Sequence, residues 1–185
     1  MIDSCSLSDD EIKKLNASSE KQYFRSSYEV FNSHKGLRPG LLHLVIGMPS
    51  GGKSTFRNSV IFDFVNLNPN KKVFLWLSEE KKRDFQKVIA KNRNLNEKMK
   101  NVFVYSEIDH RSNLKKYDAL IEDFAEKVVK SECDLFVFDN ITTSRIYGTT
   151  NETQSEFSSD IKEIFDDAKA PCVLFAHTST QIKQG

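Results

Sequence analysis

A glycine-rich segment that ends in lysine and serine carries the clearest chemical signal in the sequence. Gly47-Met-Pro-Ser-Gly-Gly-Lys-Ser-Thr55 satisfies the pattern G-x-x-x-x-G-K-[ST]. Glycines let the backbone curl so that several N–H groups point at one anion, the lysine reaches the β- and γ-phosphates, and the serine hydroxyl binds Mg²⁺. The pattern predicts a loop that binds a nucleoside triphosphate, and we expect ATP and Mg²⁺. The residues expected to contact them here are Gly47, Pro49, Ser50, Gly51, Gly52, Lys53, Ser54 and Thr55.

Asp139 follows the apolar run Leu135–Phe138, which reads as a buried strand. In open α/β sheets, ligands collect at the carboxyl ends of the strands. We therefore expect Asp139 to contribute to nucleotide binding and, together with Ser54, to position Mg²⁺. The alternative is an acidic residue that only ends a strand.

Glu79 and Glu80 follow another apolar run, Val73–Leu77. A carboxylate at this edge would orient the water that attacks the γ-phosphate or take its proton. The alternative is a solvated helix start, since acidic residues favour helix N-termini. Spacing alone favours neither interpretation, and it does not choose between the two glutamates.

His177 and Thr178 follow a further apolar run, Val173–Ala176. A polar group there would sense the γ-phosphate and relay its loss to a neighbouring loop. The alternative is an ordinary histidine at a strand end. The other histidines have no metal-ligand spacing, so the sequence predicts no zinc site; they are His34, His43 and His110.

Five short apolar runs alternate with helical patterns, which predicts an α/β fold with a mostly parallel central sheet and helices on both faces. The predicted strands are Leu42–Ile46, Val73–Leu77, Val102–Tyr105, Leu135–Phe138 and Val173–Ala176. The predicted helices between them are Lys53–Leu67, Lys81–Asn92, Asn113–Lys130 and Thr153–Ala168.

The first 35 residues have a different pattern and predict a helical N-terminal arm or linker. A capping box over Ser8–Glu11 indicates a short helix, and a second helix is expected over Glu20–Asn32. We expect the core domain to span residues 36–185.

Bulk composition indicates a globular protein of the cytoplasm. The 185 residues carry 27 basic and 26 acidic side chains, a formal net charge of +1, which as a whole does not indicate a nucleic-acid-binding protein. The apolar runs are too short to cross a bilayer and the N-terminus does not resemble a secretory signal, so no membrane partner is expected. Three widely spaced cysteines, Cys5, Cys133 and Cys172, are expected to be small buried residues in a reducing compartment.

From Gly36 to Gln181 the sequence resembles the RecA-like P-loop ATPases, especially the branch of hexameric replicative DNA helicases and their plasmid and phage relatives. The lead-in Gly36–Gly47, the loop Met48–Thr55, the strand ending in Ser78-Glu79-Glu80 and Phe175–Thr178 carry the resemblance.

The resemblance implies an Mg²⁺-dependent ATPase, a DNA helicase or a replication or recombination subunit. It assigns the catalytic glutamate to Glu80, with Glu79 as the second choice, the Mg²⁺-associated aspartate to Asp139, and the sensor to His177 and Thr178. It also implies single-stranded DNA as a partner and self-association into a ring or filament.

Three departures from this family keep other functions open. Ser179 and Thr180 stand where the helicases often carry a basic residue, the core is expected to lack its C-terminal end, and the first 35 residues are expected to be too few to form the helicases' separate N-terminal domain. A nucleotide-dependent regulatory switch of the same fold is the first alternative. A P-loop small-molecule kinase ranks last, because its lid needs arginines and Thr142–Thr153 offers only Arg145.

Overall fold

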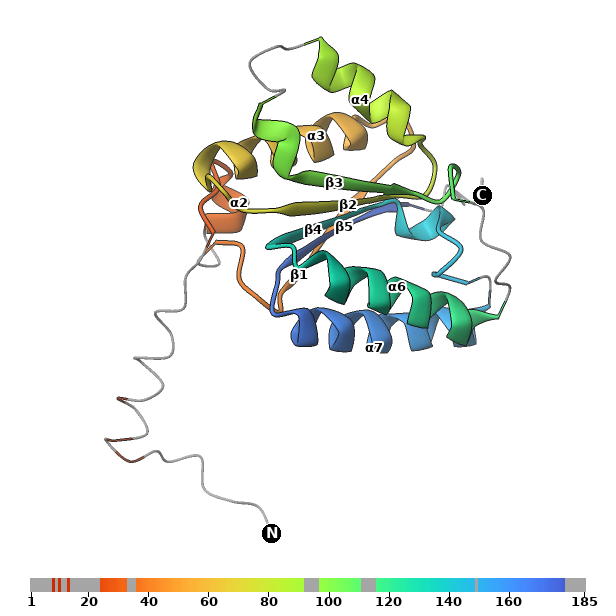
Figure 1. Ribbon diagram of the computed structural model, residues 1–185. Coiled ribbons are helices and arrows are strands. Elements are labelled where there is room, and N and C mark those ends of the chain that lie inside the picture. Colours follow the sequence, from red (N-terminus) through yellow and green to blue (C-terminus); the bar gives the residue numbers. More distant parts are fainter. Residues whose placement is uncertain are drawn as a thin grey trace, which may run out of the picture.

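The computed structural model describes residues 8, 10, 13, 24–32, 36–91, 97–110, 116–148 and 150–178. Its centre is a five-stranded sheet in the order β1-β5-β4-β2-β3, and every neighbouring pair of strands is parallel (Figure 1). The strands are β1 Leu42–Gly47, β2 Val73–Leu77, β3 Val102–Ser106, β4 Leu135–Asp139 and β5 Cys172–His177. The predicted α/β fold is confirmed, and each predicted strand is present within one residue at either end.

The apolar runs match the positions of the strands in the sheet. Strands β2 and β4 lie inside the sheet and all of their residues are buried, which a run without alternation predicts. Strand β1 lies at an edge, and its outward residues Leu44 and Ile46 are exposed. The interior strands β2 and β4 therefore appear in the sequence as continuous apolar runs and are buried on both faces, whereas the edge strand β1 is only half-buried.

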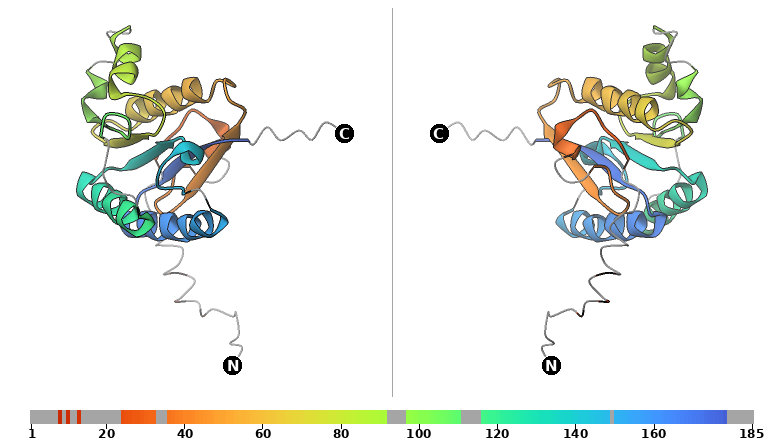
Figure 2. Two further views of the ribbon diagram at one scale, coloured as in Figure 1. Left: turned by 90° about the vertical axis from the view of Figure 1, so that its right-hand side faces the viewer. Right: turned by 90° about the vertical axis from the view of Figure 1, so that its left-hand side faces the viewer.

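Helices cover both faces of the sheet (Figures 1 and 2). One face carries α2 Glu29–Asn32, α3 Lys53–Leu67 and α4 Lys82–Ala90. The other carries α6 Tyr117–Ser131 and α7 Asn151–Ala168, which lie side by side. Two short 3₁₀ helices, η1 Lys98–Asn101 and η2 Ile141–Thr143, complete the described elements. Each face has its own apolar core: the first lies between the sheet and α2, α3 and α4, and the second lies between the sheet and α6 and α7. The prediction of helices on both faces of the sheet is therefore confirmed.

The helix predicted over Glu20–Asn32 is wrong in its described part, because only Glu29–Asn32 is helical. Phe24 instead pairs with Leu37 in an antiparallel bridge, with its N–H 3.2 Å from the Leu37 carbonyl. Asp63 on α3 accepts hydrogen bonds of 2.8 Å from the Ser26 hydroxyl and from the next backbone N–H. These contacts satisfy an extended backbone, which outweighs the local helical pattern.

The same segment packs on the core. Phe24 and Phe31 are buried, and the Phe24 ring lies 5.3 Å from that of Phe64 on α3. Glu11, the second partner of the capping box predicted over Ser8–Glu11, lies outside the described residues, and the domain boundary at residue 35 stays a prediction. Within the described residues, no helix is long and apolar enough to span a bilayer.

Two of the three cysteines lie in the second core, as expected. Cys133 and Cys172 are buried and free, and burial raises the pKa of each thiol. Cys5 lies outside the described residues. Both described thiols are therefore packing groups of the core.

Candidate functional site

The parallel register brings the predicted site residues to one edge of the sheet. Gly47 at the end of β1 is level with His177 at the end of β5, and Asp139 at the end of β4 is level with Leu77 on β2. The segments that follow these four strands therefore meet. The loop before α3, Asp139, the two glutamates after β2 and His177 all come from this edge, as the sequence predicts.

The loop between β1 and α3 has the tight curvature that its glycines allow. The Gly51 N–H donates to the Met48 carbonyl at 3.1 Å, and a Cβ added to Gly51 would lie 3.0 Å from that same oxygen. Gly52 has a φ of 80°, in the left-handed region that disfavours other residues. Its neighbour Ser50 also has a positive φ, of 60°. A side chain at Gly51 would therefore press on the Met48 carbonyl, whereas one at Gly52 would meet no atom within 4 Å but would strain the backbone.

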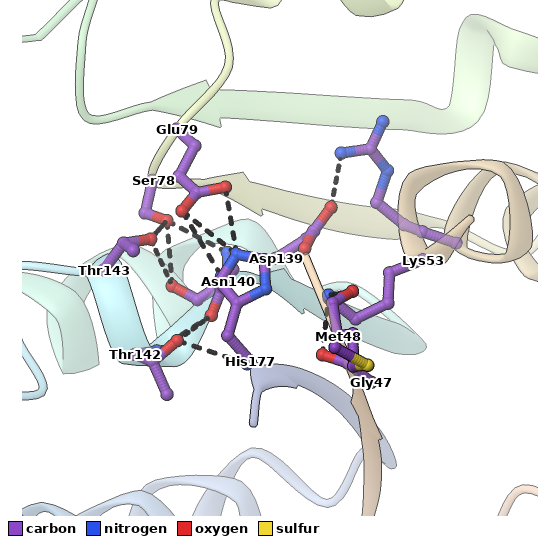
Figure 3. Close-up of polar contacts among 11 residues, drawn as sticks. Gly47, Met48, Lys53, Ser78, Glu79, Asp139, Asn140, Thr142, Thr143 and His177 are labelled. Atoms are coloured by element: carbon purple, nitrogen blue, oxygen red, sulfur yellow. Dashed lines mark hydrogen bonds and ion pairs between the residues drawn. The ribbon is translucent and has the colours of Figure 1, made fainter. Parts of the chain in front are cut away.

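Lys53, the first residue of α3, folds back over this loop (Figure 3). Its ammonium nitrogen donates to the Gly47 carbonyl at 2.8 Å and to the Met48 carbonyl at 2.7 Å. The side chain is buried, with 9% exposed. The two carbonyls hold the Lys53 ammonium beside the loop. A phosphate bound in the loop would therefore meet a counter-charge that is already in position.

Asp139 is buried at the end of β4 and pairs with an arginine that the motif does not include. Arg57 on α3 donates from Nη1 to Asp139 Oδ2 at 2.7 Å, and the same nitrogen lies 2.9 Å from Glu80 Oε2. Burial raises the pKa of the Asp139 carboxyl above its ordinary value; Arg57 opposes that shift, and Glu79 and Glu80 add to it. Asp139 and Glu80 thus share one buried cation.

Glu79 turns toward β5 rather than toward Arg57. His177 Nε2 lies 3.2 Å from Glu79 Oε1, and the Asn140 side-chain amide donates to that oxygen at 3.4 Å (Figure 3). The His177 backbone N–H donates to the Thr142 hydroxyl at 3.3 Å, and that hydroxyl donates to Asn140 Oδ1 at 2.6 Å. His177 therefore links the strand end beside the loop to both Glu79 and η2.

Ser78 fastens the ends of β2 and β4 together beneath these carboxylates. Its hydroxyl donates to the Asn140 carbonyl at 2.8 Å and accepts from the Asn140 N–H at 3.0 Å. It also lies 2.8 Å from the Thr143 hydroxyl (Figure 3). Side-chain hydrogen bonds from Ser78 therefore fix the backbone next to Asp139, in addition to the hydrogen bonds of the sheet.

A buried glutamate positions the segment after η2. Glu107, after β3, accepts from Trp76 Nε1 at 2.6 Å, from the Ser144 hydroxyl and from the Arg145 backbone N–H at 3.1 Å. Three donors on one carboxylate satisfy its buried charge. The contact ties the loop after β4 to β2 and β3, so it fixes where η2 and its two threonines, Thr142 and Thr143, lie.

Glu107→Ala is expected to destabilise the fold by about 3 kcal/mol, because it leaves the buried Trp76 N–H and Ser144 hydroxyl without their acceptor. Urea unfolding followed by the fluorescence of Trp76, the single tryptophan, measures the change. Glu126→Ala, at an exposed ion pair with Lys130, is the matched control and should shift stability by less than about 1 kcal/mol. Equal effects of the two substitutions would contradict the role assigned to Glu107.

The donor set at this edge fits a magnesium ion bound together with a nucleotide. Ser54 supplies a hydroxyl at the first turn of α3 and Asp139 supplies a carboxylate at the end of β4. Mg²⁺ usually takes one or two protein ligands and completes its shell with phosphate oxygens and waters. Among the described residues, no cluster of three or more His, Cys, Asp or Glu side chains is placed to hold a metal ion.

Sequence reasoning missed three residues of this edge: Arg57, Asn140 and Glu107. Arg57 carried a usable signal, because it lies four residues after Lys53 and therefore on the same face of α3. Asn140 follows Asp139 directly and was visible only as the next residue of the motif. Glu107 lies in a loop and carried no signal.

The fold agrees with that of a solved structure. The structure superposes on the crystal structure of a KaiC-like protein from the hyperthermophilic archaeon Pyrococcus horikoshii with a TM-score of 0.62. The match covers 87% of this chain and 74% of the other, at 19% sequence identity. The fold is therefore that of the RecA-like and KaiC-like P-loop ATPases. No protein-family model and no curated protein matches the sequence.

Proposed function

We propose that this protein binds ATP together with Mg²⁺ and hydrolyses it. The observation that carries the proposal is the loop Gly47–Thr55, whose lysine ammonium sits over the loop carbonyls at the same sheet edge as Asp139. The N-terminus of α3 adds partial positive charge where phosphates would bind. In this proposal Lys53 neutralises the phosphates, and Ser54 and Asp139 position Mg²⁺.

We assign the water-orienting role to Glu80. Its contact with Arg57 uses Oε2, which leaves Oε1 to accept a hydrogen bond from the attacking water. Glu79 is half-exposed and contacts His177. This contact suits a role in which it changes when the γ-phosphate is lost. His177 would pass that state to η2 through Thr142. Bound Mg²⁺ would contribute charge stabilisation at the phosphates.

The first test is phosphate release by the purified chain with ATP and Mg²⁺. We expect turnover that EDTA abolishes, because the phosphates carry more charge than Lys53 alone neutralises. Calorimetric titration with a non-hydrolysable ATP analogue tests binding separately. A chain that binds no analogue with Mg²⁺ would overturn the proposal, and one that binds without turnover would restrict it to a nucleotide-binding switch.

For the wider role we propose a DNA helicase or a replication or recombination ATPase that acts as a ring or filament subunit. The resemblance of the lead-in Gly36–Gly47 and of the loop to that branch supports it. The net charge of +1 instead favours the regulatory switch, since it provides no general attraction for DNA. Fluorescence anisotropy with labelled single-stranded DNA, with and without the ATP analogue, separates the two roles. Nucleotide-dependent binding supports the first, and its absence in an active ATPase supports the second.

A further inference from the structure

The buried side chain of Arg57 is the feature of this edge that the proposed ATPase mechanism leaves unused. It is 1% exposed, and its Nη1 nitrogen bridges Asp139 Oδ2 at 2.7 Å and Glu80 Oε2 at 2.9 Å. Its Nε and Nη2 donate to Asn58 Oδ1 at 3.0 and 2.9 Å, and the centre of the Phe85 ring lies 5.7 Å from its Cζ. The guanidinium is thus fully held from four sides.

The acidic partners of Arg57 are the two carboxylates to which the proposed mechanism gives Mg²⁺ positioning and water orientation. They come from β4 and from the segment after β2, whereas the arginine comes from α3, one helical turn after Lys53. Burying an ion is expensive unless its partners are placed well. One cation therefore connects the helix that begins at the phosphate loop to both carboxylates of the site.

We propose that Arg57 is a positioning residue: a built-in cation that holds Asp139 and Glu80 at the nucleotide site and lowers the dependence of nucleotide binding on Mg²⁺. The inference rests on the proposed ATP site and goes beyond it by assigning part of the counter-charge to the chain itself. Arg57 touches the carboxylates and acts through them.

The electrostatic consequence has a definite sign. With Arg57 present, one positive and two negative charges meet beside the loop. A neutral side chain at position 57 leaves two carboxylates without their cation, which repels the phosphates of a metal-free nucleotide and attracts Mg²⁺. Affinity without metal should therefore fall further than affinity with metal.

The experiment is calorimetric titration of the full chain with a non-hydrolysable ATP analogue, in excess Mg²⁺ and separately in EDTA. The measured quantity is the ratio of the two dissociation constants, metal-free over metal-bound. For Arg57→Gln we expect this ratio to rise at least tenfold above that of the unchanged protein. Arg57→Lys keeps a cation and should stay within threefold.

Two further variants separate charge from packing. Arg57→Gln combined with Glu80→Gln removes one charge of each sign and should bring the ratio back to within threefold of the unchanged protein. Arg25→Gln removes an exposed arginine beside Asn68, at the far end of α3, and is the matched control with an unchanged ratio.

Parallel loss of affinity in Mg²⁺ and in EDTA would show that Arg57 only supports the fold, and would overturn the inference while leaving the ATP site standing. If Arg57→Gln does not fold, the other two variants decide. The inference is supported if the double variant folds and if both it and Arg57→Lys keep the ratio within threefold of the unchanged protein. Any other result overturns the inference. Failure of the unchanged protein to bind the analogue in Mg²⁺ would instead overturn the proposed function itself.

Discussion

Lys53→Ala is expected to weaken binding of an ATP analogue with Mg²⁺ by about 100-fold or more. Hydrogen bonds to charged groups contribute about 1.5–3 kcal/mol each, and every 1.4 kcal/mol is a factor of ten in affinity. The lysine is positioned over the loop before the ligand arrives, because its ammonium bonds to the Gly47 and Met48 carbonyls. Isothermal titration calorimetry measures the loss.

The fold should survive this substitution. The loop retains its backbone hydrogen bond between Gly51 and Met48, and α3 retains its buried face. Circular dichroism and the unfolding midpoint check this directly. Lys87→Ala, an exposed lysine paired with Asp84 on α4, removes the same charge away from the loop and should leave affinity unchanged. Equal affinities for Lys53→Ala and Lys87→Ala would remove the basis for assigning the loop to phosphates.

Most of the fold could be predicted because its strands are strong local signals. Runs such as Val73–Leu77 and Leu135–Phe138 are apolar throughout, and in the structure every one of their residues is buried. Parallel strands separated by helices bring their carboxyl ends to one edge, so the meeting of Asp139, His177 and the loop follows from the topology. Helix ends were less accurate: α6 begins at Tyr117, four residues after its expected start.

The pairings at that edge could not be predicted, because they join residues far apart in the sequence. His177 contacts Glu79 across 98 positions, and Arg57 contacts Asp139 across 82. Spacing leaves Glu79 and Glu80 equivalent, whereas the structure turns one toward β5 and the other toward α3. The absence of the expected helix from residues 24–28 has the same origin, since Asp63 supplies the hydrogen bonds that keep Ser26 and Ser27 out of a helix.

The different surroundings of the two glutamates support different kinetic expectations. Glu80 shares Arg57 with Asp139, so it stands beside the carboxylate proposed for Mg²⁺. Glu79 lies 3.2 Å from His177, whose backbone N–H reaches η2 through Thr142. Loss of the Glu80 charge would affect the attacking water, whereas loss of the Glu79 charge would affect the contact to the neighbouring loop.

Glu80→Gln is therefore expected to bind ATP with Mg²⁺ within about threefold of the unchanged protein and to hydrolyse it about 10²- to 10⁴-fold more slowly. Loss of a group that acts on the water only in the transition state lowers turnover without lowering ground-state affinity.

Glu79→Gln is the matched control, since it makes the same change at the adjacent position. Its turnover should fall by no more than about tenfold, because only its contacts to His177 and Asn140 change, at a cost of about 1 kcal/mol. Steady-state phosphate release gives the turnover, and calorimetry with a non-hydrolysable analogue gives the affinity. If Glu79→Gln is the slow variant that still binds, the water-orienting role belongs to Glu79, and the ion pair between Glu80 and Arg57 serves position alone.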